Sequence, residues 1–191
     1  MTPRLLIFAG STRTDSWNKK LARCAAEVGS GAGAEVTIVD LRELELPLYD
    51  GDLEARDGLP AGAKRLKELM KAHHAFVIAS PEYNSSITAV LKNAIDWASR
   101  AEKDEKALAA FQGKLALLVA ASPGALGGLR GLVHLRAILS NLGMLVLPEQ
   151  LAVSKAHEAF DERGRLEDEK QRAALERHVA TLIATTAKLH G

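Results

Sequence analysis

A repeated order of segments is the feature that most constrains the fold. Three apolar runs, at residues 5–9, 75–79 and 114–121, are each followed by a polar or glycine-rich loop and then by an amphipathic helical pattern. Apolar runs without polar alternation are typical of strands buried on both faces of a parallel sheet. We expect two further strands, over 35–41 and 144–148. Because parallel strands require crossover connections, which place helices on both faces, we predict an α/β fold with a doubly wound, five-stranded parallel sheet.

The connection between residues 42 and 60 shows no sustained period, and we expect a long loop there. Two alternatives stay open for Tyr49 in this loop. Its side chain reaches a ligand at the carboxyl edge of the sheet, or it pins the loop to the core together with Leu46 and Leu48. A short amphipathic helix is expected over 61–72, and a final helix in the tail that begins at residue 167.

Composition and charge exclude several classes of partner. The 191 residues fit one α/β domain, so we expect a single domain over 1–191. With 25 basic and 24 acidic residues the net charge is +1, which predicts neither a nucleic acid nor a membrane surface as partner. No apolar run approaches the roughly 18 residues of a membrane span. The single cysteine, Cys24, allows no disulfide framework or zinc cluster, and the six histidines lack ligand spacing. We expect a soluble cytoplasmic protein without a metal site.

The loop over residues 10–18 joins the end of the first predicted strand to the start of a helix. Such a junction presents unpaired backbone N–H groups and the positive end of the helix dipole, which together attract a phosphate. The loop also carries neutral and cationic donors, among them Ser11, Arg13, Ser16 and Asn18. We therefore predict a phosphate-binding loop.

Two more loops, over 80–86 and 122–128, follow the third and fourth predicted strands and lie at the same edge of the sheet. Pro81 fixes its own φ and restrains Ser80, which stiffens the first of these turns. A stiff turn with exposed amides suits a flat ligand. Since ligands bind doubly wound sheets at the carboxyl edge, we expect a planar group beside the phosphate.

Two motifs give the chain a family resemblance. They are Gly10-Ser11-Thr12-Arg13…Ser16…Asn18…Leu21-Ala22 and Ser80-Pro81-Glu82-Tyr83-Asn84-Ser85-Ser86…Leu91-Lys92-Asn93-Ala94-Ile95-Asp96-Trp97. Together they resemble the NAD(P)H-dependent FMN reductase family, a flavodoxin-like group that includes chromate, azo-dye and quinone reductases. One departure is visible at the start of the third helix, where many members carry Pro-Gly and this chain has Thr88-Ala89.

The resemblance implies a flavodoxin-like sheet with strand order 2-1-3-4-5 and an FMN-containing oxidoreductase. It implies hydride transfer from NADPH or NADH through bound FMN to a small-molecule quinone, flavin or azo acceptor. It also implies a homodimer or homotetramer, with contacts on the third helix and near Arg100. The residues that it assigns to the FMN phosphate are Ser11, Arg13, Ser16 and Asn18. Those that it places around the flavin ring are Pro81, Glu82, Tyr83, Asn84, Ser122 and Gly124.

Some roles stay open at this point. Glu82 serves the turn geometry or acts as an acid, although the chemistry of such a site is carried by FMN and requires no catalytic side chain. Trp17 has no assigned role, while Lys92, Asp96 and Trp97 are expected in helix packing and subunit contacts. The alternative function is a flavodoxin-type electron carrier without its own NAD(P)H turnover. A nucleotide kinase is disfavoured because the chain lacks G-x-x-x-x-G-K-[ST].

Overall fold

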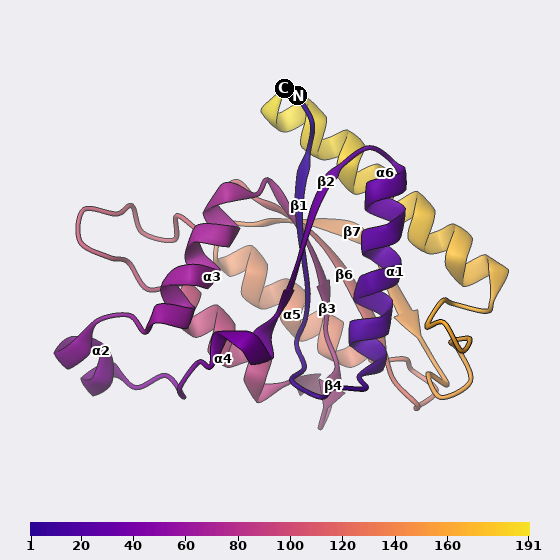
Figure 1. Cartoon of the computed structure of the whole chain (residues 1–191), viewed down its shortest axis with the longest axis horizontal. Helices are drawn as coiled ribbons and strands as arrows, with labels where there is room; N and C mark the ends of the chain where they lie inside the picture. The colour runs from indigo at the N-terminus through magenta and orange to yellow at the C-terminus, as the bar shows by residue number, and fades with distance from the viewer.

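One parallel sheet organises the chain. The structure is a computed structural model that describes residues 1–191. Its main sheet has five strands in the order β2-β1-β3-β6-β7, and every neighbouring pair is parallel (Figure 1). The strands are β1 (Arg4–Ala9), β2 (Glu35–Asp40), β3 (Ala75–Ala79), β6 (Leu115–Ala121) and β7 (Leu145–Val153). Counted along the chain, these strands follow the order 2-1-3-4-5, so the predicted doubly wound, flavodoxin-like sheet is confirmed.

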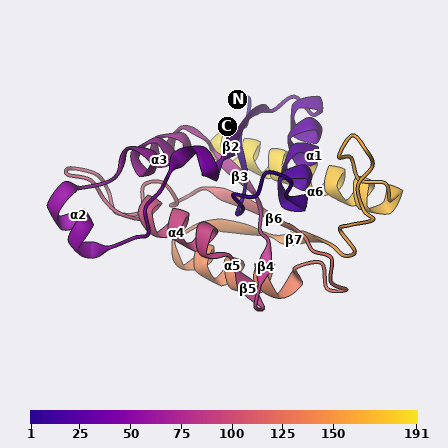
Figure 2. The ribbon, with the colours of Figure 1, turned by 60° about the horizontal axis from the view of Figure 1, so that its bottom comes forward.

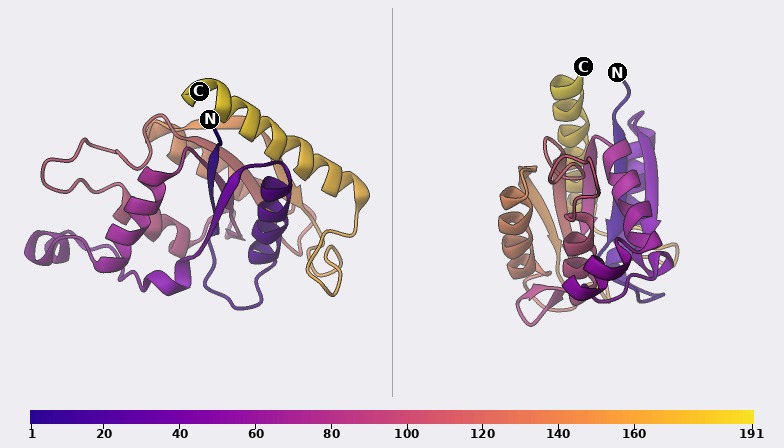
Figure 3. Two further views of the ribbon diagram at one scale, coloured as in Figure 1. Left: turned by 45° about the horizontal axis from the view of Figure 1, so that its top comes forward. Right: turned by 90° about the vertical axis from the view of Figure 1, so that its left-hand side faces the viewer.

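Helices cover both faces of the sheet. On one face lie α1 (Trp17–Gly31) and α6 (Glu169–His190), and on the other lie α4 (Ala89–Ala98) and α5 (Leu129–Asn141), as Figure 2 shows. Each face of the sheet has its own hydrophobic core. Leu5 and Ile7 of β1 belong to the core beneath α1 and α6, whereas Leu6 and Phe8 belong to the core beneath α4 and α5, which α3 (Ala61–Ala72) also covers. This alternation follows from the two-residue period of a strand, and it explains why β1 is apolar at every position. The two chain termini lie near each other (Figure 3).

The connection after β2 contains structure that the sequence analysis missed. A 3-10 helix, η1 (Leu41–Leu44), follows β2 directly, and α2 (Gly51–Asp57) begins after Asp50. The Asp50 carboxylate accepts a hydrogen bond of 2.8 Å from the backbone N–H of Asp52 and so caps α2. A seven-residue helix that buries none of its residues leaves no apolar period in the sequence.

Tyr49 pins this connection to α4. Its backbone N–H donates to Asn93 Oδ1 at 2.8 Å, and its hydroxyl donates to the Glu54 carboxylate at 2.8 Å. Its ring meets the buried Trp97 ring edge-on, with the centroids 5.0 Å apart. Of the two alternatives for Tyr49, the structure shows the attachment of the loop, in which Leu46 also packs against the core, whereas Leu48 is exposed and the prediction for it is wrong.

The predicted loop over 80–86 and the predicted strand over 144–148 need correction. The segment after β3 folds into a hairpin of β4 (Glu82–Tyr83) and β5 (Ser86–Ile87), whose turn residues Asn84 and Ser85 have φ of 51° and 65°. Positive φ at both central residues matches the twist of a tight hairpin. Strand β7 runs past the predicted end at Pro148. It is an edge strand with a shifted register opposite Ala116 and Leu118, where a proline costs no ladder hydrogen bond.

A buried ion pair stabilises the outer side of α3. Lys67 is 1% exposed, and its ammonium donates to the Glu105 carboxylate and, at 2.6 Å, to the carbonyl of Arg100. Glu105 also accepts from Lys71 at 3.0 Å. Burial alone raises the pKa of Glu105, but the hydrogen bonds from Lys67 and Lys71 outweigh it and lower the pKa to about 2. The ionised carboxylate is therefore strongly favoured in the folded state.

We predict that Glu105→Gln lowers the free energy of unfolding by about 3 kcal/mol at pH 7, because it leaves the Lys67 ammonium buried without its counter-ion. The folded-state pKa is depressed, so this contribution is complete above the ordinary carboxyl pKa of about 4.5 and is lost as the pH falls toward 2. Urea denaturation at pH 7 and pH 3 measures it. The matched control is Glu68→Gln, since Glu68 also contacts Lys71 but is 65% exposed. A difference between wild type and Glu105→Gln that is the same at both pH values contradicts the prediction.

Candidate functional site

An open pocket of about 380 Å³ lies where three strand-end loops meet at the carboxyl edge of the sheet. Figure 1 shows the loop between β1 and α1 beside β4 at this edge. The loops after β1, β3 and β6 each contribute to the wall. The lining residues are Ser11, Arg13, Ser16, Trp17, Asn18, Pro81, Glu82, Tyr83, Ala121, Ser122 and Pro123. Most of the predicted site residues are thus brought together, whereas Asn84 and Gly124 lie outside the lining.

The start of α1 faces this pocket with unused hydrogen-bond donors. Ser16 is the N-cap residue, in an extended conformation, and its side chain makes no capping hydrogen bond. The backbone N–H groups of Trp17, Asn18 and Lys19 have no acceptor in the protein. Ser11 and Ser16 are each 6% exposed, and Ser11 Oγ accepts a hydrogen bond of 3.2 Å from the backbone N–H of Arg13. An uncapped helix start with two serines in the same pocket lining is suited to a bound anion.

Arg13 lies over the indole of Trp17. Its guanidinium carbon is 5.7 Å from the ring centroid, and Nη2 donates to the carbonyl of Asp15 at 3.2 Å. A cation above an aromatic face is favourable, and the contact limits the directions that this long side chain can take. Trp17, which had no assigned role in the sequence analysis, therefore supports Arg13 at the rim of the pocket.

Asn18 has a connecting role that sequence reasoning missed. Its side-chain Nδ2 donates to the carbonyl of Ala121 at 2.8 Å, and its Oδ1 accepts from the N–H of Ala121 at 3.0 Å. This paired contact joins the first turn of α1 to the last residue of β6. Toward the pocket, Asn18 therefore offers its backbone N–H.

Thr88 connects the β1 loop to α4. Its hydroxyl donates to the carbonyl of Gly10 at 2.6 Å and accepts from the N–H of Leu91 at 3.1 Å, which caps α4. A Cβ at Gly10 would lie 2.8 Å from Leu91 Cβ, so only glycine permits this close approach. The departure from Pro-Gly at Thr88-Ala89 thus supplies both a helix cap and a contact to the β1 loop.

Glu82 caps α5 from the neighbouring hairpin. The N-cap residue of α5, Gly128, has no side chain, and the Glu82 carboxylate instead accepts from the N–H of Gly131 at 3.1 Å. It also accepts from Arg130 Nε at 2.8 Å and Nη2 at 2.6 Å. Burial raises the pKa of Glu82, but these hydrogen bonds outweigh burial and hold the pKa below its ordinary value. The geometry therefore supports a role in the turn and makes Glu82 a poor proton donor.

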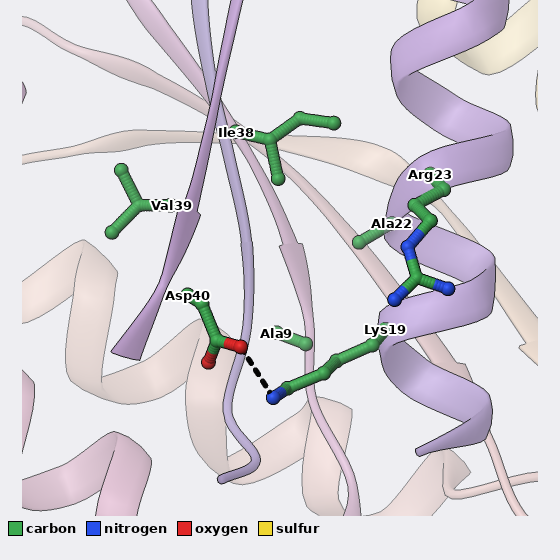
Figure 4. Close-up of a pocket in the computed structure, with 7 residues that line it drawn as sticks. All are labelled: Ala9, Lys19, Ala22, Arg23, Ile38, Val39 and Asp40. Atoms are coloured by element: carbon green, nitrogen blue, oxygen red, sulfur yellow. Dashed lines mark hydrogen bonds and ion pairs between the residues drawn. The ribbon is translucent and has the colours of Figure 1, made fainter. Parts of the chain in front are cut away.

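A second layer of charged residues supports the β1 loop from the side of β2. Lys19 and Asp40 both line an open pocket of about 370 Å³ and form an ion pair there, with Lys19 Nζ and Asp40 Oδ2 2.6 Å apart (Figure 4). Asp40 Oδ1 accepts from the N–H of Arg42 at 3.0 Å, and Arg42 Nη1 donates to Thr14 Oγ1 at 2.9 Å. Sequence analysis missed this chain of contacts, although the position of Asp40 at the end of a predicted strand was visible.

The strand order defines a flavodoxin-like α/β protein, in which an uncapped helix start faces a pocket at the carboxyl edge of the sheet. A structural likeness to a flavodoxin from the domain Archaea agrees with this class, with a TM-score of 0.61 at 10% identity over 96% of this chain and 99% of that one. Residues 3–158 match the family model described as NADPH-dependent FMN reductase. The chain belongs to this family.

Individual relatives carry the same assignment. An NAD(P)H-dependent FMN reductase of Pseudomonas aeruginosa is 35% identical over 189 residues, which cover 98% of this chain and 97% of that protein. A quinone reductase of Escherichia coli is 36% identical over 145 residues, 75% of this chain and 73% of that protein. The structure of FerB, an NAD(P)H:(acceptor) oxidoreductase from Paracoccus denitrificans, matches with a TM-score of 0.82 and 29% identity over 98% of both chains. The expected class of enzyme, an NAD(P)H-dependent FMN or quinone reductase, is confirmed.

No helix of the structure is both long and apolar enough to cross a membrane.

We predict that Glu82→Gln lowers the free energy of unfolding by about 1–2 kcal/mol at pH 7, because charge-assisted hydrogen bonds to Arg130 and to the start of α5 are weakened. Arg130→Gln and the double variant close a mutant cycle that isolates the pair. The pH dependence of kcat/KM with a quinone acceptor is expected to keep its shape in Glu82→Gln. Loss of one limb of that profile would instead assign Glu82 an acid–base role.

Proposed function

We propose that the pocket binds FMN with its phosphate on the β1–α1 loop. The supporting observation is the uncapped start of α1, whose free amides lie in one pocket with the largely buried residues Ser11 and Ser16 and with Arg13. A phosphate monoester dianion requires several donors together with positive charge, and this donor set fits it. Asn18 contributes through its backbone N–H while its side chain fixes the helix start.

The flavin ring is proposed to lie against the β3 and β6 loops. Pro81, Glu82 and Tyr83 border it from the hairpin, whose form depends on the left-handed conformation of Asn84. Ser122 closes the opposite side. Gly124 acts through Ser122, because its N–H donates to Ser122 Oγ at 3.3 Å. Tyr83 is exposed, which leaves one side of this pocket accessible to a second molecule.

The proposed reaction uses NADPH or NADH as donor and a quinone, flavin or azo compound as acceptor. The chemistry that bound FMN supplies is the uptake of a hydride from the nicotinamide and its delivery to the acceptor. The residues of the chain bind and orient the partners. None of them has to transfer a proton, in agreement with a Glu82 carboxylate that is held ionised by Arg130 and the start of α5.

We also propose that residues 1–191 form one FMN-binding domain that works in the cytoplasm as a homodimer or homotetramer. The single main sheet, with a core on each face, supports one domain. Contacts between subunits are proposed on α4 and around Arg100, where the Lys92–Asp96 ion pair lies exposed on the helix surface. The single cysteine suits a reducing compartment.

Purified protein tests the function directly. We expect FMN to copurify, with its visible absorbance, and NADPH or NADH to be oxidised steadily once a quinone is added. FMN-loaded protein that oxidises neither nucleotide would overturn the reductase and favour a flavodoxin-type electron carrier. Protein that binds no FMN would overturn the flavin site itself.

We predict that Arg13→Ala raises the dissociation constant of FMN by about tenfold to a hundredfold, because one charge-assisted contact to the phosphate is removed. Titration of the apoprotein with FMN, followed by quenching of flavin fluorescence, measures the change. Arg23→Ala is the matched control, since Arg23 lies on the second turn of α1 and lines a different pocket. Equal FMN affinity in Arg13→Ala and wild type would show that Arg13 does not face the phosphate.

A further inference from the structure

We propose that the open pocket between α1 and the edge strand β2 binds a small monocarboxylate. Its carboxylate would lie between Lys19 and Arg23, and its hydrocarbon part would cover Ile38 (Figure 4). The pocket holds about 370 Å³ and shares no lining residue with the proposed flavin pocket. The site therefore goes beyond the proposed function and does not depend on it.

Small side chains at the edge of the sheet leave this space open. Strand β2 has a neighbour on one side only. Where α1 approaches the strand ends, Ala9 and Ala22 are both buried and contribute only methyl groups to the lining. Ile38 is 53% exposed and faces this space from β2, while Val39 points away from it (Figure 4). A single exposed isoleucine is ordinary on a protein surface, but here it forms one apolar wall of a pocket.

The wall that α1 contributes is cationic. Lys19 and Arg23 are four residues apart, so their side chains lie on the same face of the helix. Lys19 is 9% exposed, and its ammonium donates to Asp40 Oδ2 at 2.6 Å, which uses one of its three donors. Arg23 is exposed and makes no hydrogen bond or ion pair, and Asp15 on the preceding loop pairs with Lys20 instead, at 3.0 Å. Two cationic groups with unused donors therefore face one space.

Asp40 limits the charge that the pocket accepts. Its Oδ2 accepts from Lys19 and its Oδ1 accepts from the backbone N–H of Arg42 at 3.0 Å, so each oxygen already has a donor. Burial raises the pKa of Asp40, but these hydrogen bonds outweigh burial and hold the pKa below its ordinary value. Lys19 and Arg23 together with the ionised Asp40 give the lining a net charge of +1. A monoanion balances this charge, whereas a phosphate dianion would be repelled by Asp40.

A short monocarboxylate matches both walls of the pocket. Its two oxygens can accept charge-assisted hydrogen bonds from an ammonium and a guanidinium. Its hydrocarbon part would remove Ile38 and the methyl group of Ala22 from water, which is favourable. Because Lys19 belongs to the first turn of α1, this ligand would lie behind the proposed phosphate site and would not compete with FMN.

The test is a titration of ¹⁵N-labelled protein, as purified, with sodium pentanoate, followed by two-dimensional NMR of the backbone amides. We expect saturable shifts that are largest for Arg23, Ile38 and Asp40. Pentanamide is the neutral probe of the same shape, and it is expected to bind about tenfold more weakly or worse because the charge-assisted hydrogen bonds are lost. Inorganic phosphate is expected to give smaller shifts at these three residues.

Two variants at exposed positions test the two walls separately. Arg23→Gln is expected to raise the dissociation constant of pentanoate about tenfold, because one cationic donor is removed. Arg65→Gln is the matched control and should stay within about twofold of wild type, since Arg65 is an exposed arginine on α3 outside this pocket. Ile38→Thr keeps a β-branched side chain but removes apolar surface, and we expect about threefold weaker binding.

Shifts that do not saturate, or equal pentanoate affinity in Arg23→Gln and wild type, would overturn the proposal. Shifts centred on Tyr83 and Ser122 together with a perturbed flavin absorbance would also overturn it, because they would place pentanoate in the flavin pocket. Protein that contains no FMN would overturn the proposed function alone. The pentanoate titration still decides in that case, because Arg23 and Ile38 lie outside the flavin pocket.

Discussion

The geometry of the site depends on one paired contact between the side chain of Asn18 and the backbone of Ala121. These residues are 103 positions apart in the chain, and both hydrogen bonds are buried. Asn18 is only 3% exposed, so a broken bond would leave a polar group without water, at a cost of about 1–3 kcal/mol. The contact holds the start of α1 against the end of β6. The contact thereby adds a specific link between the free amides of α1 and the loop at Ser122 to the packing of α1 on the sheet.

The other loops are held in the same manner, by a hydrogen bond from outside the pocket. Thr88 bonds to Gly10, Glu82 caps α5, and Arg42 bonds to Thr14. Each of these contacts ties a loop to a neighbouring element and leaves the donors that line the pocket free. Fixing the loops before a ligand arrives lowers the entropic cost of binding. The proposed phosphate site agrees with a net charge of +1, because its positive potential would come from local amides and a single guanidinium group.

Much of the fold could be predicted from the sequence because strong apolar periodicity marks each core element. The predicted 61–72 helix and 75–79 strand agree with α3 and β3 at both ends. The misses have physical reasons. Helix α2 buries nothing, the hairpin at Asn84 depends on φ, and β7 passes through Pro148 because its outer edge is unpaired. The supporting roles of Asn18, Thr88 and Glu82 were invisible because each depends on a partner distant in sequence, and no local pattern encodes such a partner.

The β1–α1 loop carries a constraint that the other two loops lack. Its consecutive residues Ser11, Thr12 and Arg13 line pockets on its two sides, so the backbone is shared between both walls. Thr88 holds this segment at Gly10, and Arg42 holds it at Thr14. A shift of the backbone that improved one wall would therefore distort the other, because both ends are fixed. This geometry accounts for the need for glycine at position 10, where any side chain would collide with Leu91 and move the whole segment.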